Sequence, residues 1–380
     1  MIRVALSTSV LQRGRSGVAT YIFGLLDGMQ KIGAPVQLCL LGLADDKPLF
    51  EKWLDHCQWI PVEERYRPAV RNVIWHQTTL RSLLIREKID LLHIPSYRRI
   101  VARPPCPQVV TIHDLAAFAV RGKYDMARMI YGKYVVRQLA RKAQIVTTVS
   151  QATASDVTKY FGIPASAITV IWNGIDHDLF RPQRAEDIRA ALDRLKLRKP
   201  YFIYLARLEH PAKNHLRLIE AFELFCAQNP SQEHELVLGG ADWHGAEVIH
   251  RRIASSPVRD RIVTAGFVEK TDLPFWYAGA TAMVYPSLFE GFGLPPAEAM
   301  ACGCPVISSP RGSLGEIAGD AALLIDPESA GSIGQALADV VLHPDKTREL
   351  SVRGIARASL FSWEKAATTL CQLYNQAALH

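Results

Sequence analysis

Short apolar runs alternate with longer stretches of helical periodicity along most of the chain. Such runs between polar segments are typical of buried parallel strands, and the stretches between them predict crossover helices. A first set of predicted strands occupies residues 3–7, 36–41, 91–93, 109–113, 145–149 and 168–172. A second set occupies residues 201–205, 235–239, 262–264, 282–285, 305–308 and 322–325. The pattern therefore predicts two α/β sheets, joined near the charged stretch 182–200.

The composition is that of a folded chain with more than one core. Of the 380 residues, 49% are hydrophobic and 21% are charged, which excludes a disordered chain, a coiled coil and a collagen-like repeat. No apolar run reaches the length of a membrane span, and the first residues predict a strand rather than a signal peptide, so we expect a cytoplasmic protein. Seven scattered cysteines do not suggest a disulfide framework.

Positive charge is concentrated in the first half of the chain. Residues 1–182 hold 24 Lys and Arg against 14 Asp and Glu. Within them, the segment 121–142 interleaves basic and apolar residues and predicts a basic amphipathic helix, with a patch formed by Lys133, Arg137, Arg141 and Lys142. This patch is either a solvated helix face or a surface that attracts anionic lipid headgroups or a phosphorylated acceptor. Nucleic acid is not an expected partner, because no nucleic-acid-binding signature accompanies the charge.

Ligands of open α/β sheets bind beyond the carboxyl ends of the strands, so the residues there are candidates for a site. The first predicted strand leads into a loop that contains Gly14, Arg15, Ser16 and Gly17, and the following helix offers free N–H groups to an anion. Its spacing is neither that of a dinucleotide-binding turn nor that of a P-loop, and a simple strand-to-helix turn is the alternative. At another strand end, His113 either orients a substrate hydroxyl or bonds to nearby backbone.

The second half offers two cations and two carboxylates at strand ends. Arg207 and Lys213 can clamp a diphosphate, Arg207 with two donors and Lys213 as a point charge, although surface charge is the alternative. Glu290 lies in a glycine-rich turn, and Glu298 lies in the next helix, where it is either a ligand or an ordinary first-turn acid. Two bare carboxylates suggest a glycoside hydrolase. The neighbouring cations and helix N-terminus favour instead a nucleoside diphosphate whose sugar hydroxyls bind the carboxylates.

Several segments together resemble one large enzyme family. They are the Glu290 and Glu298 pair within residues 289–307 and the segments 207–214, 266–268, 173–176 and 361–363. These segments resemble the retaining GT-B glycosyltransferases of glycosyltransferase family four, over most of the chain. Within that family, the chain is most similar to bacterial polysaccharide mannosyltransferases.

The resemblance implies an α/β, GT-B architecture of two Rossmann-like doubly wound domains facing across a cleft. Residues 1–182 plus 363–380 are expected to form an N-terminal acceptor-binding domain with a returning C-terminal helix. Residues 183–362 are expected to form a C-terminal nucleotide-sugar-binding domain. The family likeness implies no metal and no cofactor apart from the nucleotide-sugar substrate.

The resemblance also implies roles for single residues. The expected catalytic residues are His113, Arg207, Lys213 and Glu290. The expected donor-binding residues are Arg207, Lys213, Val268, Glu290, Gly291, Phe292, Gly293, Leu294 and Glu298. In this set Glu298 holds ribose hydroxyls, Arg207 and Lys213 hold the diphosphate, Glu290 holds the transferred sugar, and the backbone around Val268 holds the base. The loop of Gly14, Arg15, Ser16 and Gly17 is expected beside the acceptor or the phosphates. Arg207 and Lys213 stand one residue further apart than in many family members.

The implied function is retaining transfer of a hexose, expected to be mannose from GDP-mannose, onto a lipid-linked or polysaccharide acceptor in bacterial surface-glycan synthesis. One alternative is an enzyme that uses UDP-glucose or another nucleotide sugar, including a sugar-phosphate synthase with a soluble acceptor. A non-catalytic sugar-nucleotide sensor is a further alternative. The expected partners are the nucleotide sugar, a glycan or lipid-diphosphate-linked acceptor, and an anionic membrane surface. The protein would then be cytoplasmic and peripheral to the inner membrane.

Overall fold

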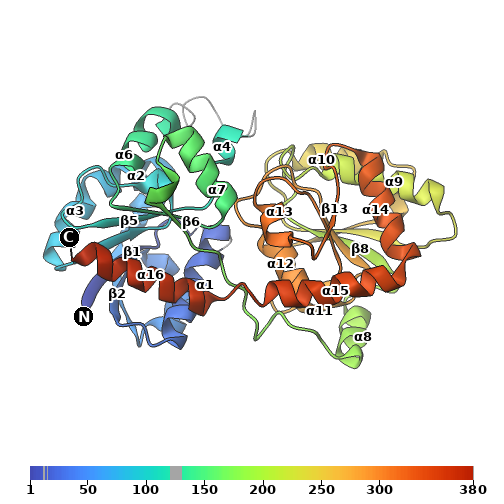
Figure 1. Cartoon of the computed structure of the whole chain (residues 1–380), viewed down its shortest axis with the longest axis horizontal. Coiled ribbons are helices and arrows are strands. Elements are labelled where there is room, and N and C mark those ends of the chain that lie inside the picture. Colours follow the sequence, from blue (N-terminus) through green and yellow to red (C-terminus); the bar gives the residue numbers. More distant parts are fainter. Residues whose placement is uncertain (12, 15, 120–130, 380) are drawn as a thin grey trace. The chain divides into compact units, whose positions relative to one another are not determined.

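The chain forms two compact units in a computed structural model, which describes residues 1–11, 13–14, 16–119 and 131–379 (Figure 1). The first unit comprises Met1–Gly174 and Ser362–His380, and the second comprises Ile175–Phe361. The terminal segment therefore belongs with the beginning of the chain rather than with the residues that precede it.

The units divide the chain eight residues earlier than the sequence suggested, at 174/175 instead of 182/183. The N–H of Ile175 donates to the carbonyl of Phe361, and the ring of Phe180 packs against Tyr277. These contacts attach the segment to the second unit, and they are invisible in the local composition.

A seven-stranded parallel sheet forms the centre of the first unit. Its strand order is β3-β2-β1-β4-β5-β6-β7. The chain therefore adds β2 and β3 on one side of β1, and then adds β4 to β7 on the other side of β1. The strands are β1 (Ile2–Ser7), β2 (Val36–Leu43), β3 (Cys57–Val62), β4 (Leu91–Ile94), β5 (Gln108–Ile112), β6 (Ile145–Thr148) and β7 (Ile168–Val170). All of their pairings are parallel.

Strand β3 is absent from the predicted set. Its residues include Gln58 and Pro61, which interrupt the apolar run that marks a buried strand. Proline cannot donate to a strand ladder and is tolerated at a sheet edge. Strand β3 lies at such an edge and, among the described strands, pairs with β2 alone.

Alternate strand residues of the first sheet supply a core on each face. Val4 and Leu6 pack on the face covered by helices α1 (Gly17–Lys31) and α16 (Trp363–Ala378), whereas Ala5 belongs to the core of the opposite face. Helices α1 and α16 approach closely, because a Cβ atom at Gly24 would lie 2.0 Å from the ring of Trp363. Glycine at this position therefore permits the C-terminal helix to dock.

The other described helices of the first unit are short. The α-helices are α2 (Ala69–Gln77), α3 (Thr79–Arg86), α4 (Ala116–Ala119), α6 (Arg137–Arg141) and α7 (Gln151–Asp156). The 3-10 helices are η1 (Ala44–Trp53), η2 (Glu64–Tyr66), η3 (Tyr97–Arg99) and η6 (Ala165–Ala167). The π-helices are η4 (Tyr131–Val136) and η5 (Val157–Phe161).

The second unit follows the same plan around a six-stranded parallel sheet of order β10-β9-β8-β11-β12-β13. Its strands are β8 (Tyr201–Leu205), β9 (Glu235–Gly239), β10 (Ile262–Gly266), β11 (Ala282–Tyr285), β12 (Val306–Ser308) and β13 (Leu323–Leu324). The connections diverge between β8 and β11, as they diverge between β1 and β4 in the first sheet. Ligands of open α/β sheets bind beyond the strand ends at such a switch point. The prediction of two doubly wound α/β sheets is confirmed.

Helices cover both faces of the second sheet (Figure 1). They are α8 (Ala185–Arg194), α9 (His215–Gln228), α10 (Ala246–Ala254), η7 (Arg259–Arg261), α11 (Leu273–Ala278), α12 (Leu294–Ala301), α13 (Ser313–Ala318), α14 (Ala330–Leu342) and α15 (Pro344–Ala358). Helix α9 packs with α10 and α14, and α12 packs with α11 and α15. Helix α8 occupies the charged stretch that the sequence marked as the junction.

Candidate functional site

A largely buried ion pair spans the switch point of the second sheet. Lys213 follows β8 and Glu290 follows β11, and Lys213 Nζ lies 2.5 Å from Glu290 Oε1. Each side chain is only 14% exposed. The hydroxyl of Tyr204 donates to the carbonyl of Lys213 at 2.7 Å and fixes the end of the intervening loop. Arg207 and Lys213 are one residue further apart than in many family members, and Lys213 still reaches Glu290, the other residue predicted for this site.

Side-chain hydroxyls hold the glycine-rich turn that carries Glu290. The hydroxyl of Tyr285 donates to Glu290 Oε1 at 3.1 Å, and Ser313 Oγ lies 2.9 Å from the carbonyl oxygens of both Glu290 and Phe292. Gly293 caps α12 with a φ of +102°, a conformation that favours glycine. The turn and the first position of α12 contain four predicted donor-binding residues: Gly291, Phe292, Gly293 and Leu294.

The carboxylate of Glu298 is half-buried on α12, close to the turn. Burial raises the pKa of this carboxyl to about 7, while a hydrogen bond from Tyr277 and the charge of Lys270 act to lower it. The hydroxyl of Tyr277 donates to Glu298 Oε2 at 3.2 Å. Glu298 therefore titrates close to neutral pH, and its ionised form can accept hydrogen bonds from ligand hydroxyls.

Arg207 contacts different groups from Lys213. Its Nη2 lies 3.3 Å from Glu209 Oε2, and its guanidinium lies over the ring of Trp243, 4.7 Å from the centroid. Its side chain is 42% exposed. The structure therefore places both predicted diphosphate cations after β8. Their side chains pair with different carboxylates, Glu209 for Arg207 and Glu290 for Lys213, although the backbone N–H of Lys213 also donates to the carbonyl of Glu209.

Val268 follows β10, and its side chain packs towards the end of β9. A Cβ atom at Gly239 would lie 3.3 Å from Val268 Cγ2. Trp243, which follows β9, was missed by the sequence reasoning. A tryptophan shortly after a glycine pair at a strand end is the sequence signal that would have identified it.

In the first unit, His113 directly follows β5. The carbonyl of Pro95 accepts a hydrogen bond from its imidazole, and the ring of Tyr21 meets it edge-on with centroids 4.7 Å apart. Nε2 is buried and has no hydrogen-bond partner among the described residues. Burial lowers the pKa of His113 to about 4, so the ring is neutral at pH 7. Nδ1 is then the donor to Pro95, and Nε2 is an acceptor that suits a substrate hydroxyl.

The loop before α1 is partly explained by helix capping. Gly14 has a φ of +79°, and Gly17 is the first residue of α1. Ser16 Oγ accepts from the N–H of Ala19 at 3.2 Å and donates to the carbonyl of Leu11 at 3.1 Å. Ser16 is therefore a helix cap, whereas Arg15 lies outside the described residues.

The two arginines of the predicted basic patch have a local hydrogen-bond acceptor. The predicted amphipathic helix, residues 121–142, is described from η4 onwards, because residues 120–130 lie outside the described residues. Arg137 and Arg141 donate through Nε to the carbonyl of Phe161, at 3.3 and 2.7 Å, and so cap the end of η5. Lys133 and Lys142 are exposed. No helix within the described ranges is long and apolar enough to cross a bilayer.

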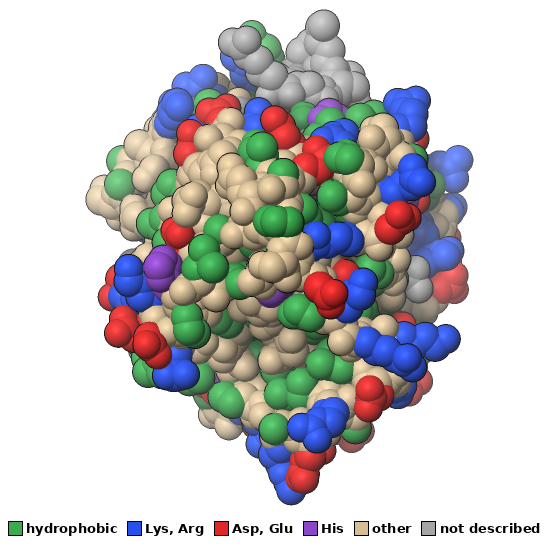
Figure 2. Space-filling model, turned by 90° about the vertical axis from the view of Figure 1, so that its right-hand side faces the viewer, with side chains coloured by type: hydrophobic (Ala, Val, Ile, Leu, Met, Phe, Trp, Pro, Cys, Tyr) green, Lys and Arg blue, Asp and Glu red, His purple; other side chains and the backbone are tan. Residues whose placement is uncertain are grey.

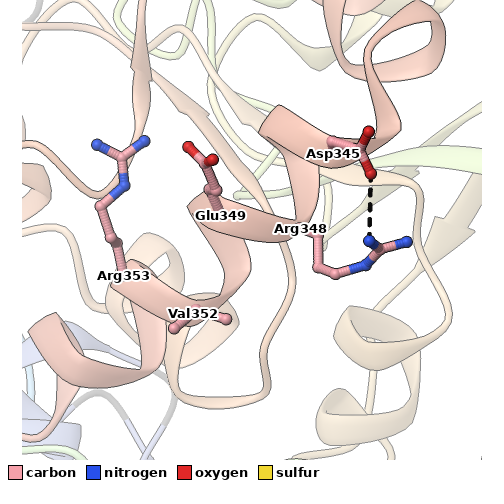
Figure 3. A pocket seen from close by; sticks show the side chains of 5 residues that line it. All are labelled: Asp345, Arg348, Glu349, Val352 and Arg353. Carbon is pink, nitrogen blue, oxygen red and sulfur yellow. Dashed lines mark hydrogen bonds and ion pairs between the residues drawn. The ribbon is translucent and has the colours of Figure 1, made fainter.

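A surface hollow on α15 is separate from these residues. It is lined by Asp345, Arg348, Glu349, Val352 and Arg353, all exposed (Figure 3). Gly354 on the same helix is buried against Met300 of α12, so the hollow lies on the outer side of α15. Figure 2 shows acidic and basic side chains interspersed over one face of the molecule. In the described part of the chain, no group of three His, Cys, Asp or Glu side chains could hold a metal ion.

Comparisons with known proteins agree with this arrangement. Residues 15–179 match the model of Glycosyltransferase Family 4, and residues 186–357 match that of Glycosyl transferases group 1. The O-antigen chain mannosyltransferase B of Escherichia coli is 31% identical over 269 residues, 70% of each chain. Sucrose-phosphate synthase of Thermosynechococcus elongatus has a TM-score of 0.78 at 21% identity, over 99% of both chains. HepE of Anabaena in complex with UDP-glucose has a TM-score of 0.77 at 20% identity, over 99% of this chain and 100% of that chain.

Two doubly wound parallel sheets with these relatives define a GT-B glycosyltransferase. The chain belongs to glycosyltransferase family four. The family resemblance inferred from the sequence is confirmed.

Separate removal of Lys213 or Glu290 should destabilise the second unit. Either Lys213→Met or Glu290→Gln leaves a largely buried group without its partner, and each should lower the free energy of unfolding by about 3 kcal/mol. The double variant should lose clearly less than the sum, because neither charge is then left alone. Denaturant unfolding of the four proteins measures this coupling.

The matched control is the pair of Asp345 and Arg348 on α15, whose side chains are 90% and 75% exposed (Figure 3). Its coupling should stay below about 1 kcal/mol, because water screens an exposed pair. Equal coupling in the two pairs would contradict the buried character of the Lys213 and Glu290 contact.

Proposed function

We propose that the protein transfers mannose from GDP-mannose, with retention, onto a lipid-linked or polysaccharide acceptor in bacterial surface-glycan synthesis. The observation that carries the proposal is the Lys213 and Glu290 pair at the switch point of the second sheet, with Glu298 on the adjoining helix. A diphosphate suits Lys213, and sugar hydroxyls suit the two carboxylates. The relative from Escherichia coli is named a mannosyltransferase, which favours mannose over other hexoses.

In this reaction the bond from the anomeric carbon to the diphosphate oxygen breaks, and a bond from the same carbon to an acceptor oxygen forms on the same face. The acceptor proton passes to the departing phosphate oxygen, so no carboxylate nucleophile is required. Fixed cations stabilise the negative charge that develops on the diphosphate, and Lys213 and Arg207 are the residues for this role. Neutral His113 accepts a hydrogen bond from a sugar hydroxyl through Nε2 and positions the donor.

A UDP-sugar enzyme with a soluble acceptor is the second candidate. It is favoured by the likeness in fold to a sucrose-phosphate synthase and to a protein solved with UDP-glucose. At about 20% identity these likenesses concern the fold alone. The base and the sugar of the donor are therefore to be identified by binding measurements.

Thermal stabilisation by a panel of GDP, UDP, ADP, dTDP and their sugars tests the proposal. A ligand that binds only the folded chain raises the melting temperature according to its affinity. GDP and GDP-mannose should stabilise the protein selectively. Selective stabilisation by UDP compounds would show that the donor is a UDP-sugar and not GDP-mannose. If no nucleotide or nucleotide sugar raises the melting temperature, a non-catalytic protein is favoured.

Donor affinity should depend on pH through Glu298. Hydroxyl groups donate to the ionised carboxylate, and this form is lost as the pH falls through about 7. The Kd for GDP-mannose should therefore be constant above pH 8 and rise below pH 7, by up to about tenfold per unit. Calorimetry at a series of pH values measures it, since the diphosphate diester of the donor does not titrate in this range.

Glu298→Gln is the control for the pH series. It should bind the donor more weakly at every pH and show no such dependence, because an amide does not titrate. A wild-type Kd that is flat between pH 5.5 and 8.5 would remove Glu298 from the hydroxyl-binding role.

Contact with an anionic membrane is part of the proposal for a lipid-linked acceptor. Lys133 and Lys142 are the residues to test, because Arg137 and Arg141 also cap η5. Lys133→Gln with Lys142→Gln should reduce binding to phosphatidylglycerol vesicles, and salt should reduce wild-type binding in the same way. The matched control neutralises Lys196 and Lys199 of the second unit. Equal vesicle binding by both double variants would contradict the proposed membrane contact.

A further inference from the structure

The switch point of the first sheet carries a cation that has no carboxylate partner among the described residues. Arg99 is the last residue of η3, which follows β4. Its Nε donates to Asn72 Oδ1 at 2.5 Å, and its Nη1 donates to the carbonyl of Arg98 at 3.4 Å. Both acceptors are neutral. Among the described residues, the charges that act on Arg99 are those of Tyr131 and Arg98, and neither belongs to an acid that is ionised at pH 7.

A buried polar network fixes the partner of Arg99. Asn72 Nδ2 donates to Ser9 Oγ at 3.2 Å, and the carbonyl of Asn72 accepts from His76 Nδ1 at 2.7 Å. His76 Nε2 lies 2.9 Å from Ser7 Oγ. Burial lowers the pKa of His76 to about 3, so the network is uncharged at pH 7. It therefore orients Arg99 and offers no opposite charge.

The guanidinium of Arg99 has donors to spare. An arginine side chain carries five N–H groups, of which the described contacts use two. A half-buried cation without a counter-charge is costly, and burial lowers the pKa of Arg99 to about 10. An anion would offset this cost. Forked donors in a fixed position match the oxygens of a phosphate.

The same edge of the sheet carries His113. Strands β1, β4 and β5 are neighbours, and they end at Ser7, Ile94 and Ile112. Pro95, which links β4 to η3, accepts the hydrogen bond of the His113 imidazole. A ligand held by Arg99 therefore lies at the same edge of the sheet as His113, whose Nε2 has no hydrogen-bond partner among the described residues.

We propose that Arg99 binds a phosphate group of the acceptor, next to His113 at the switch point of the first sheet. This rests on the proposed function only in calling the phosphorylated ligand the acceptor. The phosphate belongs to a lipid diphosphate or to a soluble sugar phosphate, and both offer the same oxygens to the guanidinium.

Calorimetry with inorganic pyrophosphate tests the site in a background that carries both Arg207→Ala and Lys213→Ala, where both proposed donor cations are absent. Arg99→Gln should weaken pyrophosphate binding at least about tenfold, because charge-assisted bonds are lost. The matched control is Arg98→Gln, since Arg98 is the adjacent arginine of η3 and stacks on Tyr97. It should change the affinity less than about twofold. Unchanged binding by Arg99→Gln overturns the proposal.

A second measurement uses the unmodified protein and does not depend on how the variants fold. Phenylglyoxal modifies arginine side chains, and peptide mass spectrometry locates the adducts. Pyrophosphate should protect Arg99 several-fold more than Arg98. Equal protection of the two arginines, or none, overturns the proposal.

Farnesyl diphosphate and mannose 6-phosphate distinguish the two phosphate sources. Whichever binds more tightly identifies the source, and binding of both should fall in Arg99→Gln. If no nucleotide stabilises the protein but pyrophosphate still protects Arg99, the proposed function fails and the phosphate site stands. If GDP-mannose binds but Arg99 is unprotected, the phosphate site alone fails.

Discussion

Parallel pairing brings the carboxyl ends of all strands of a sheet to one edge, and the candidate site depends on this constraint. Lys213 and Glu290 are 77 residues apart, yet they meet because β8 and β11 are neighbours whose connections leave in opposite directions. Right-handed crossovers place the helices after β8 and after β11 on opposite faces. The space between them is left to the loops, which carry the charged side chains.

Two carboxylates of the second unit differ because their surroundings differ. Glu290 forms an ion pair with Lys213, whose Nζ lies 2.5 Å from its Oε1. Glu298 is half-buried, and its hydrogen bond from Tyr277 only partly offsets the effect of burial on its pKa. One carboxylate is therefore held in an ion pair, whereas the pKa of the other lies near neutral pH. Such a division suits a site in which one group orients a cation and the other binds hydroxyls.

Local patterns were sufficient for most strands and for the residues at their ends. Buried parallel strands are continuous apolar runs, so they are visible without tertiary information, and strand ends mark Lys213, Glu290 and His113 directly. Strand β3 was missed because an edge strand with Pro61 needs no apolar run. Glu298 was identified as a candidate from its place in the helix after the turn, and the family resemblance implied its role. Its bond to Tyr277 spans 21 residues and depends on how α11 packs on α12.

The direction of a long side chain is the part that sequence could not supply. Arg137 and Arg141 were expected in a surface patch, but the carbonyl of Phe161, 20 to 24 residues away, is their hydrogen-bond acceptor. Arg99 attracted no attention in the sequence, because its neighbour Asn72 is 27 residues distant and belongs to another helix. Charge counts locate basic residues in a half of the chain and say nothing about their partners.

The two switch points differ in how their cations are balanced. At Lys213 an incoming anion must compete with Glu290, so binding requires the pair to rearrange or to share the cation. At Arg99 the described partners are an amide oxygen and a backbone carbonyl, which leave the positive charge uncompensated. An anion that binds there displaces no carboxylate, and water is its main competitor. The excess positive charge of the first half is a total over many side chains, whereas this one guanidinium is held in place by the buried network of Asn72.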